Sequence, residues 1–188
     1  SASKSGTADQ EPLPVTSEPT VRAYRGRFLL KWSLFVVMAG VCLAVDLVTK
    51  HLAEQRIALD ETIRVFSFFY LDRTANDGAA FGLLGGKSTF IIVANFVALA
   101  VVGFYVLMER RAWLAGIAGG AVVGGSVGNL VQRLSGDGHV TDFLKFPHWP
   151  NFNMADVFID AGIAAIVIGL VWEAVRLYRA GRRGPASP

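Results

Sequence analysis

Four long apolar stretches divide the chain, and each is long enough to cross a lipid bilayer as a helix. They cover about residues 28–48, 88–108, 112–131 and 155–175. A helix rises 1.5 Å per residue, so roughly 20 apolar residues cross a hydrocarbon core of ~30 Å. The second and third stretches carry no charge, whereas Lys31 and Asp46 interrupt the first. The pattern predicts a polytopic α-helical membrane protein with four transmembrane helices.

The third stretch is rich in glycine, which lets a neighbouring helix approach its backbone closely. Its glycines are Gly116, Gly119, Gly120, Gly124, Gly125 and Gly128. Between the first two stretches, residues 62–71 mix β-branched and aromatic side chains, and the turn-forming Asn76, Asp77 and Gly78 follow. This composition predicts a small sheet lying on the membrane surface.

The two ends of the chain differ in composition from the membrane domain. Residues 1–24 are rich in Ser, Thr, Pro and Glu and are expected to form a disordered cytoplasmic tail. Residues 25–180 are expected to form one four-helix membrane domain, and residues 181–188 a cytoplasmic C-terminal tail.

Lys and Arg side chains predict the orientation of the helices. They gather before the first stretch, at Arg110 and Arg111 between the second and third, and after the fourth. Because Lys and Arg are enriched in cytoplasmic connections, both termini are expected inside the cell. The other two connections, 50–87 and 132–154, are then expected outside, which predicts a multi-pass membrane protein with both termini in the cytoplasm.

Composition narrows the function. Hydrophobic residues make up 53% of the chain and charged residues only 18%, against about 25% charged in soluble domains. The net charge of +3 reflects arginines beside the membrane stretches, so no nucleic acid is expected as a partner. Cys42 is the only cysteine, which excludes an internal disulfide and a cysteine-based zinc site.

Ionisable and amide side chains inside or beside membrane helices are candidates for function, because charge is costly there. The candidates are Asp46, Lys50, Asn76, Asn129, Arg133, Asp142, Asn153, Asp156 and Asp160. Asp46 and Lys50 stand four residues apart, so they face each other on one helix. A structural ion pair and a substrate-side role are both open for them.

Asp142 and Asp156 flank a segment that is expected to form a re-entrant hairpin on the outward side, which would bring them together. Two adjacent carboxyl groups cannot both ionise cheaply, so one keeps a proton. The pair then supplies a general base for water and a general acid for a leaving amine. Helix capping and solvated loop charge are the alternative interpretation.

Other function classes fit less well. Gly124, Ser126 and Gly128 match a G-x-S-x-G serine motif, but a nucleophile elbow needs a strand-to-helix turn rather than a membrane helix. The three histidines form no cluster with metal-ligand spacing. A small transporter that uses its carboxylates as a proton or ion relay is the main alternative, although no internal repeat supports it. A non-catalytic scaffold is the third class.

Taken together, five ordered motifs resemble the type II, or lipoprotein, signal peptidases of bacteria over residues 28–178. They are Asp46-Leu-Val-Thr-Lys50, Asn76-Asp-Gly-Ala-Ala-Phe-Gly82, Gly124-Gly-Ser-Val-Gly-Asn129 with Arg133, Gly138-His-Val-Thr-Asp-Phe143 and Phe152-Asn-Met-Ala-Asp156. The resemblance implies four transmembrane helices with a small extracytoplasmic β-rich cradle, in the bacterial inner membrane with the active site at the outer face. It also implies an aspartic endopeptidase with Asp142 and Asp156 as its catalytic dyad. The supporting or substrate-binding residues it implies are Asp46, Lys50, Asn76, Gly78, Asn129, Arg133 and Asn153.

The resemblance also implies the substrate, a prolipoprotein cut before an S-diacylglyceryl cysteine. The protein is expected to lie among membrane lipids and to act as a monomer. The implied reaction needs no metal or cofactor. One position departs from the pattern: members usually carry an acid directly before the arginine, where this chain has Gln132. We therefore expect loop carbonyls or Asp137 to hold Arg133 and expect Gln132→Asp to be tolerated. The role of Asp160, one turn past Asp156, stays open.

Overall fold

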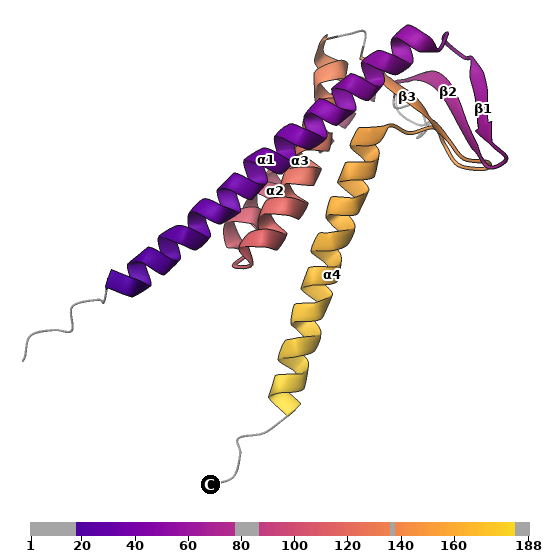
Figure 1. Ribbon diagram of the computed structural model, residues 1–188. Coiled ribbons are helices and arrows are strands. Elements are labelled where there is room, and N and C mark those ends of the chain that lie inside the picture. Colours follow the sequence, from indigo (N-terminus) through magenta and orange to yellow (C-terminus); the bar gives the residue numbers. More distant parts are fainter. Residues whose placement is uncertain (1–17, 78–86, 136–137, 183–188) are drawn as a thin grey trace, which may run out of the picture.

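The computed structural model describes residues 18–77, 87–135 and 138–182. Its elements, in chain order, are α1 (Glu18–Arg56), β1 (Thr62–Phe66), β2 (Phe69–Asn76), α2 (Lys87–Met108), α3 (Ala112–Ser135), β3 (Val140–Lys145) and α4 (Met154–Arg182). The helices form one body, α4 diverges from α1 along its length, and the strands lie at the end of the helices where α1 ends and α4 begins (Figure 1).

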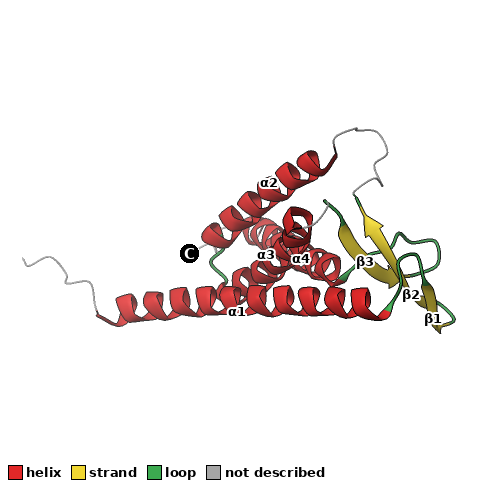
Figure 2. Cartoon of the chain, turned by 90° about the horizontal axis from the view of Figure 1, so that it is seen from above, coloured by secondary structure: helices red, strands yellow, loops and turns green. Residues whose placement is uncertain are grey.

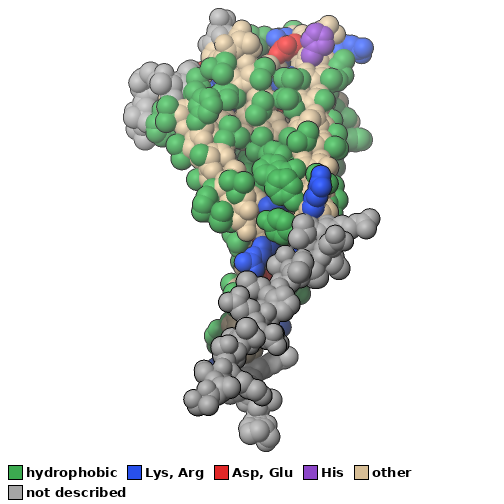
Figure 3. Space-filling view, turned by 90° about the vertical axis from the view of Figure 1, so that its left-hand side faces the viewer, with side chains coloured by type: hydrophobic (Ala, Val, Ile, Leu, Met, Phe, Trp, Pro, Cys, Tyr) green, Lys and Arg blue, Asp and Glu red, His purple; other side chains and the backbone are tan. Residues whose placement is uncertain are grey.

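Four helices of the described residues are long and apolar enough to cross a membrane, which confirms the predicted four-helix fold. Each extends beyond its apolar stretch because no helix-breaking residue stops it at the edge of the hydrocarbon. α1 begins at Glu18, so residues 18–24, expected in the tail, are helical, and α4 continues to Arg182. Figure 3 shows hydrophobic side chains covering the helical face, with charged side chains towards its ends.

α3 is the central helix, and its glycines explain how. About 78% of its most apolar 18-residue segment is buried, against 6% for the corresponding segments of α1 and α2. A Cβ atom placed on Gly116, Gly120 or Gly124 would lie 2.5–2.8 Å from backbone oxygens of α1. Gly162 of α4 meets the backbone of α3 in the same way. The glycines therefore let α1 and α4 pack directly on the backbone of α3, as the sequence predicts.

A three-stranded antiparallel sheet, ordered β1-β2-β3, completes the fold (Figure 2). The hairpin of β1 and β2 falls in the segment predicted to be β-rich, whereas β3 was not predicted. β2 and β3 pair with Thr74 opposite Asp142 and Asn76 opposite Val140. Phe143 of β3 packs on Ala53 and Ile57 at the end of α1, which fixes the sheet to the helices.

The expected re-entrant hairpin between Asp142 and Asp156 is a different structure. β3 leaves the sheet into a turn in which His148 has a φ of 62°, and Phe152 then returns to bridge Leu144. Asp142 therefore lies on a strand rather than at the end of a membrane helix, because the backbone of β3 finds its hydrogen-bond partners in β2 and Phe152.

We expect Gly124→Val to destabilise the protein, because its Cβ would lie 2.5 Å from the carbonyl oxygen of Ala39 and 2.9 Å from the Cβ of Cys42. Overpacking of this kind costs about 1–3 kcal/mol. Thermal unfolding in detergent, followed by tryptophan fluorescence, measures the effect. Gly103→Val is the matched control, since that glycine of α2 has open space around it. Equal unfolding midpoints for the two variants would contradict the packing described for α3.

Candidate active site

Asp46 and Lys50 of α1 form a buried ion pair, as their spacing predicts. The Lys50 Nζ donates to Asp46 Oδ2 at 2.8 Å. The side chain of Asp46 is 0% exposed and that of Lys50 is 2% exposed. The same Nζ donates to Asn129 Oδ1 of α3 at 2.7 Å. A buried ammonium is stable only when its hydrogen bonds are satisfied. Because its two partners lie on different helices, Lys50 links α1 to α3.

The first turn of α4 is capped by its own residues. The Asp156 N–H donates to Asn153 Oδ1 at 3.2 Å, and the Asn153 N–H donates back to Asp156 Oδ2 at 3.1 Å. This reciprocal pattern is a capping box, which satisfies N–H groups that the helix itself leaves free. The Ala155 N–H donates to Asp46 Oδ1 at 2.9 Å, so α1 also anchors the start of α4.

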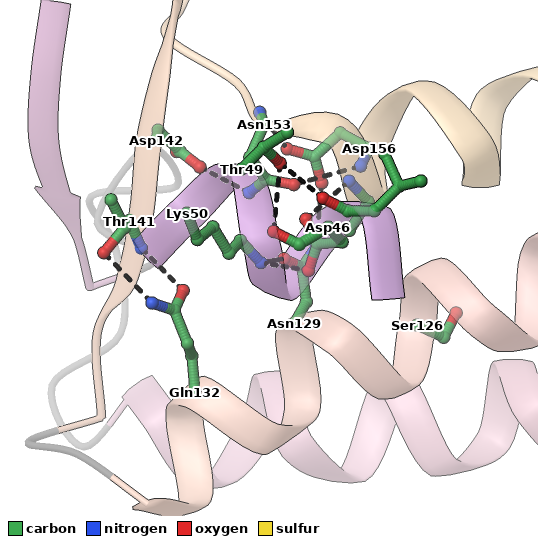
Figure 4. Close-up of polar contacts among 12 residues, drawn as sticks. Asp46, Thr49, Lys50, Ser126, Asn129, Gln132, Thr141, Asp142, Asn153 and Asp156 are labelled. Atoms are coloured by element: carbon green, nitrogen blue, oxygen red, sulfur yellow. Dashed lines mark hydrogen bonds and ion pairs between the residues drawn. The ribbon is translucent and has the colours of Figure 1, made fainter. Parts of the chain in front are cut away.

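The two predicted aspartates are both held by one residue, Asn153. Asn153 Nδ2 donates to Asp142 Oδ1 at 2.6 Å, while the Asn153 backbone holds Asp156. Asn76 Nδ2 of β2 donates to the other oxygen of Asp142 at 2.7 Å, and Asn129 Nδ2 donates to Asp156 Oδ1 at 2.9 Å. Figure 4 shows Asp142, Asn153 and Asp156 side by side above Lys50 and Asn129.

The two carboxyl groups lie in different surroundings. Burial raises the pKa of Asp142 to about 6, with hydrogen bonds from Asn76 and Asn153 opposing the rise and the charge of Asp156 adding to it. Asp156 lies in the first turn of α4, where the helix dipole favours negative charge. The arrangement can therefore hold one protonated and one ionised carboxyl, as acid–base chemistry on water requires.

Arg133 lies near this pair, and none of the salt bridges among residues 18–77, 87–135 and 138–182 includes it. Its Nε is buried and has no hydrogen-bond partner among the described residues, although its charge is close enough to interact with both aspartates. Asp137 and Gly78, two residues named from the sequence, lie outside the described residues. Asp160 is exposed, and among the described residues it makes no hydrogen bond to the aspartates.

Gln132 makes contacts that the sequence did not predict. Its Nε2 donates to Glu54 Oε1 at 2.9 Å and to Thr141 Oγ1 at 3.1 Å, and its Oε1 accepts the Thr141 N–H at 2.9 Å. An aspartate at position 132 would be shorter, could not donate, and would face the carboxylate of Glu54. This geometry argues against the tolerance expected for Gln132→Asp.

The four apolar helices and the paired aspartates define the class of an aspartic peptidase embedded in a membrane. Comparison with known proteins supplies the family. The family model described as Signal peptidase (SPase) II matches residues 38–172. The chain therefore belongs to the signal peptidase II family, whose members are aspartic peptidases.

Relatives and a solved structure agree with this assignment. A lipoprotein signal peptidase of Symbiobacterium thermophilum is 39% identical over 145 residues, covering 73% of this chain and 94% of the relative. One of Moorella thermoacetica is 36% identical and covers 80% and 97%. A solved structure described as a bacterial membrane enzyme superposes with a TM-score of 0.67 at 25% identity, covering 72% of this chain and 91% of the other. The protein removes signal peptides from prolipoproteins.

We expect Asp46→Ala to be strongly destabilising, because it leaves the Lys50 ammonium buried without its counter-charge. Breaking a buried ion pair in this way costs about 3–5 kcal/mol. The unfolding midpoint in detergent measures the loss, and the double variant Asp46→Ala/Lys50→Met should recover part of it.

Glu173→Ala is the control for this experiment, since Glu173 also pairs within a helix, with Arg176, but is 36% exposed. Exposed pairs contribute at most about 1 kcal/mol. A loss for Asp46→Ala no larger than that of the control would contradict the structural importance of the buried pair.

Proposed function

We propose that Asp142 and Asp156 are the catalytic dyad with which this signal peptidase hydrolyses its substrate. The observation that carries the proposal is the side chain of Asn153, which holds Asp142 directly while its backbone N–H holds Asp156. Two carboxyl groups held on one residue, one of them with a raised pKa, match the needs of hydrolysis by an activated water.

In the proposed reaction, ionised Asp156 takes a proton from a water molecule, and the water oxygen attacks the carbonyl carbon of the scissile peptide bond. The tetrahedral intermediate collapses when the C–N bond breaks. Asp142 gives its proton to the leaving amine. The proton on Asp156 then passes to Asp142, which restores the starting state. No covalent enzyme intermediate is formed in this sequence of steps.

The other polar residues support the dyad. Asn76 and Asn153 orient Asp142, whereas Asn129 holds Asp156 and is itself held by Lys50. Asp46 fixes the start of α4. We propose that Arg133, whose Nε has no partner among the described residues, binds a backbone carbonyl of the substrate. Gly78 keeps the supporting role that the family resemblance implies.

We propose that the substrate is cut immediately before a cysteine carrying a diacylglyceryl thioether. The site lies where the membrane helices meet the sheet (Figure 1), so the acyl chains and the signal peptide helix can stay in lipid while the scissile bond reaches water. We propose a monomer as the active form. No cofactor is part of the proposal.

The arginines support an orientation with the site outside the cytoplasm. Arg110 and Arg111 lie between α2 and α3, and Arg176, Arg179 and Arg182 lie in the last turns of α4, all at the end of the helices away from the sheet. Because basic connections face the cytoplasm, we place both termini there, in the inner membrane of a bacterium.

We expect Asp142→Asn and Asp156→Asn each to lower cleavage by roughly 10²–10⁴-fold, since an amide can neither accept the proton of water nor donate one to the amine as an acid does. The measurement is cleavage of a diacylglyceryl-modified prolipoprotein by the purified protein in lipid vesicles. Asp160→Asn is the control, because that side chain is exposed and outside the network. Either dyad variant cleaving at the rate of the control would overturn the assignment.

The pH dependence of cleavage tests the environment of Asp142. If Asp142 must hold a proton, kcat/KM falls as pH rises through the pKa of about 6. The Asn76 hydrogen bond stabilises the ionised form and lowers this pKa. Asn76→Ala should therefore raise the pKa and move the fall to higher pH.

Asn151→Ala is the control for the pH profile, because Asn151 contacts Asp72 and Thr74 in the same sheet rather than Asp142. Its profile should match that of the unmodified protein. A fall in Asn76→Ala that stays in place, or moves to lower pH, would show that the limb does not report on Asp142.

A further inference from the structure

The strand that carries Asp142 has one edge that no other strand of the sheet pairs with. β3 pairs with β2 on one side only, because it is the last strand of the sheet. On its other side, Phe152 accepts hydrogen bonds from Phe143 and Leu144. Further towards the start of β3, the Thr141 N–H is instead bound by the side-chain carbonyl of Gln132.

The side chain of Gln132 substitutes for a neighbouring strand at this point. Its Oε1 accepts the Thr141 N–H as a backbone carbonyl would, and its Nε2 donates to the Thr141 hydroxyl. The hydroxyl in turn donates to Glu54 Oε1 at 2.5 Å, and the same oxygen accepts the second N–H of Gln132 at 2.9 Å. Figure 4 shows Gln132 reaching from α3 to Thr141, directly beside Asp142 in the strand.

These contacts connect three elements of the site. Glu54 lies one turn beyond Lys50 on α1, Gln132 lies three residues beyond Asn129 on α3, and Thr141 directly precedes Asp142 on β3. Asp156 is already fixed by Asn129 and by the cap of α4. Asp142 accepts hydrogen bonds from Asn76 and Asn153. Because it lies on β3, its distance from Asp156 also depends on where that strand lies relative to the helices.

We propose that Gln132, with Glu54 and Thr141, is a positioning clamp that sets the place of Asp142 relative to Asp156. The proposal rests on the dyad proposed above, and it gives Gln132 a role in the rate of cleavage without contact with the substrate. It also explains the chemistry required at this position. Because Thr141 offers an N–H and Glu54 offers a carboxylate, only a side chain that both accepts and donates can satisfy both partners.

The sharpest test changes Gln132 to the isosteric glutamate. Gln132→Glu keeps the acceptor for the Thr141 N–H, loses both donated hydrogen bonds, and places a negative charge against Glu54. A displacement of about 1 Å in an active site can cost about 100-fold in rate. We expect kcat to fall about 10–100-fold with KM within about twofold, because the clamp acts on the dyad rather than on substrate binding.

The exchanged pair provides the rescue. In Glu54→Gln/Gln132→Glu the donor sits on α1 and the carboxylate on α3, so all three partners are again satisfied, and kcat should return to within about threefold of the unmodified protein. Gln55→Glu is the matched control, since it makes the same chemical change one residue from Glu54, at a side chain that contacts His51 instead. It should leave kcat unchanged.

The outcomes separate the clamp from simple stability and from the dyad. Unfolding midpoints are measured for every variant. If Gln132→Glu does not fold, Thr141→Val takes its place: it removes the hydroxyl that contacts Gln132 and Glu54 and should lower kcat by a smaller factor. A Gln132→Glu protein as active as Gln55→Glu, or one that the exchange fails to rescue, overturns the clamp. Asp142→Asn is assayed alongside: if it still cleaves, the dyad itself is wrong, whereas an inactive Asp142→Asn with a fully active Gln132→Glu contradicts the clamp alone.

Discussion

A charged ammonium group buried among membrane helices is the constraint on which the site depends. Lys50 is 1% exposed, so solvent cannot replace a missing hydrogen bond to its ammonium group. Its partners, Asp46 and Asn129, are therefore required rather than optional. Each partner has a second contact, Asp46 with the Ala155 N–H and Asn129 with Asp156. Satisfying one charge thus fixes α1, α3 and α4 against one another and places one of the two aspartates.

Close helix packing makes this network geometrically possible. Gly128 of α3 lies directly against the carboxylate of Asp46, and a Cβ atom at that position would collide with it. Gly124, one turn earlier, meets the backbone of α1. The glycines therefore bring α3 close enough for Asn129 to reach Lys50. In a membrane, where burial of apolar surface adds little between helices, such close packing and polar contacts are the main sources of association.

The sequence predicted the elements that depend on local patterns. The lengths of the apolar stretches predicted the four helices, and the spacing of Asp46 and Lys50 predicted their ion pair. Helix capping, the alternative interpretation of Asp142 and Asp156 from the sequence, is also present, because Asn153 and Asp156 cap the first turn of α4. The pairing of Asp142 with Asp156 was predicted from chemistry and from the family resemblance, and the structure brings both onto Asn153.

Contacts between distant parts of the chain were not predictable in the same way. β3 is defined by pairing with β2, which lies far away in sequence, and its six residues, Val140–Lys145, carry no distinctive alternation. Glu54 lies outside the family motifs, and Thr141 stands in one of them only as a neighbour of Asp142. Their importance follows from the contacts that Gln132 makes with both. The departure at Gln132 was visible as an unusual residue, but its partners come from other elements.

The most direct test of this account is the titration of Asp142 itself. Infrared difference spectra of the protein in lipid vesicles, compared with those of Asp142→Asn, isolate the carboxyl band of this residue as pH is varied. The account predicts a midpoint at about 6, raised by burial and by the neighbouring Asp156. A midpoint at the ordinary value of 3.8 would contradict it, because Asp142 would then be ionised and unable to act as the acid of the pair.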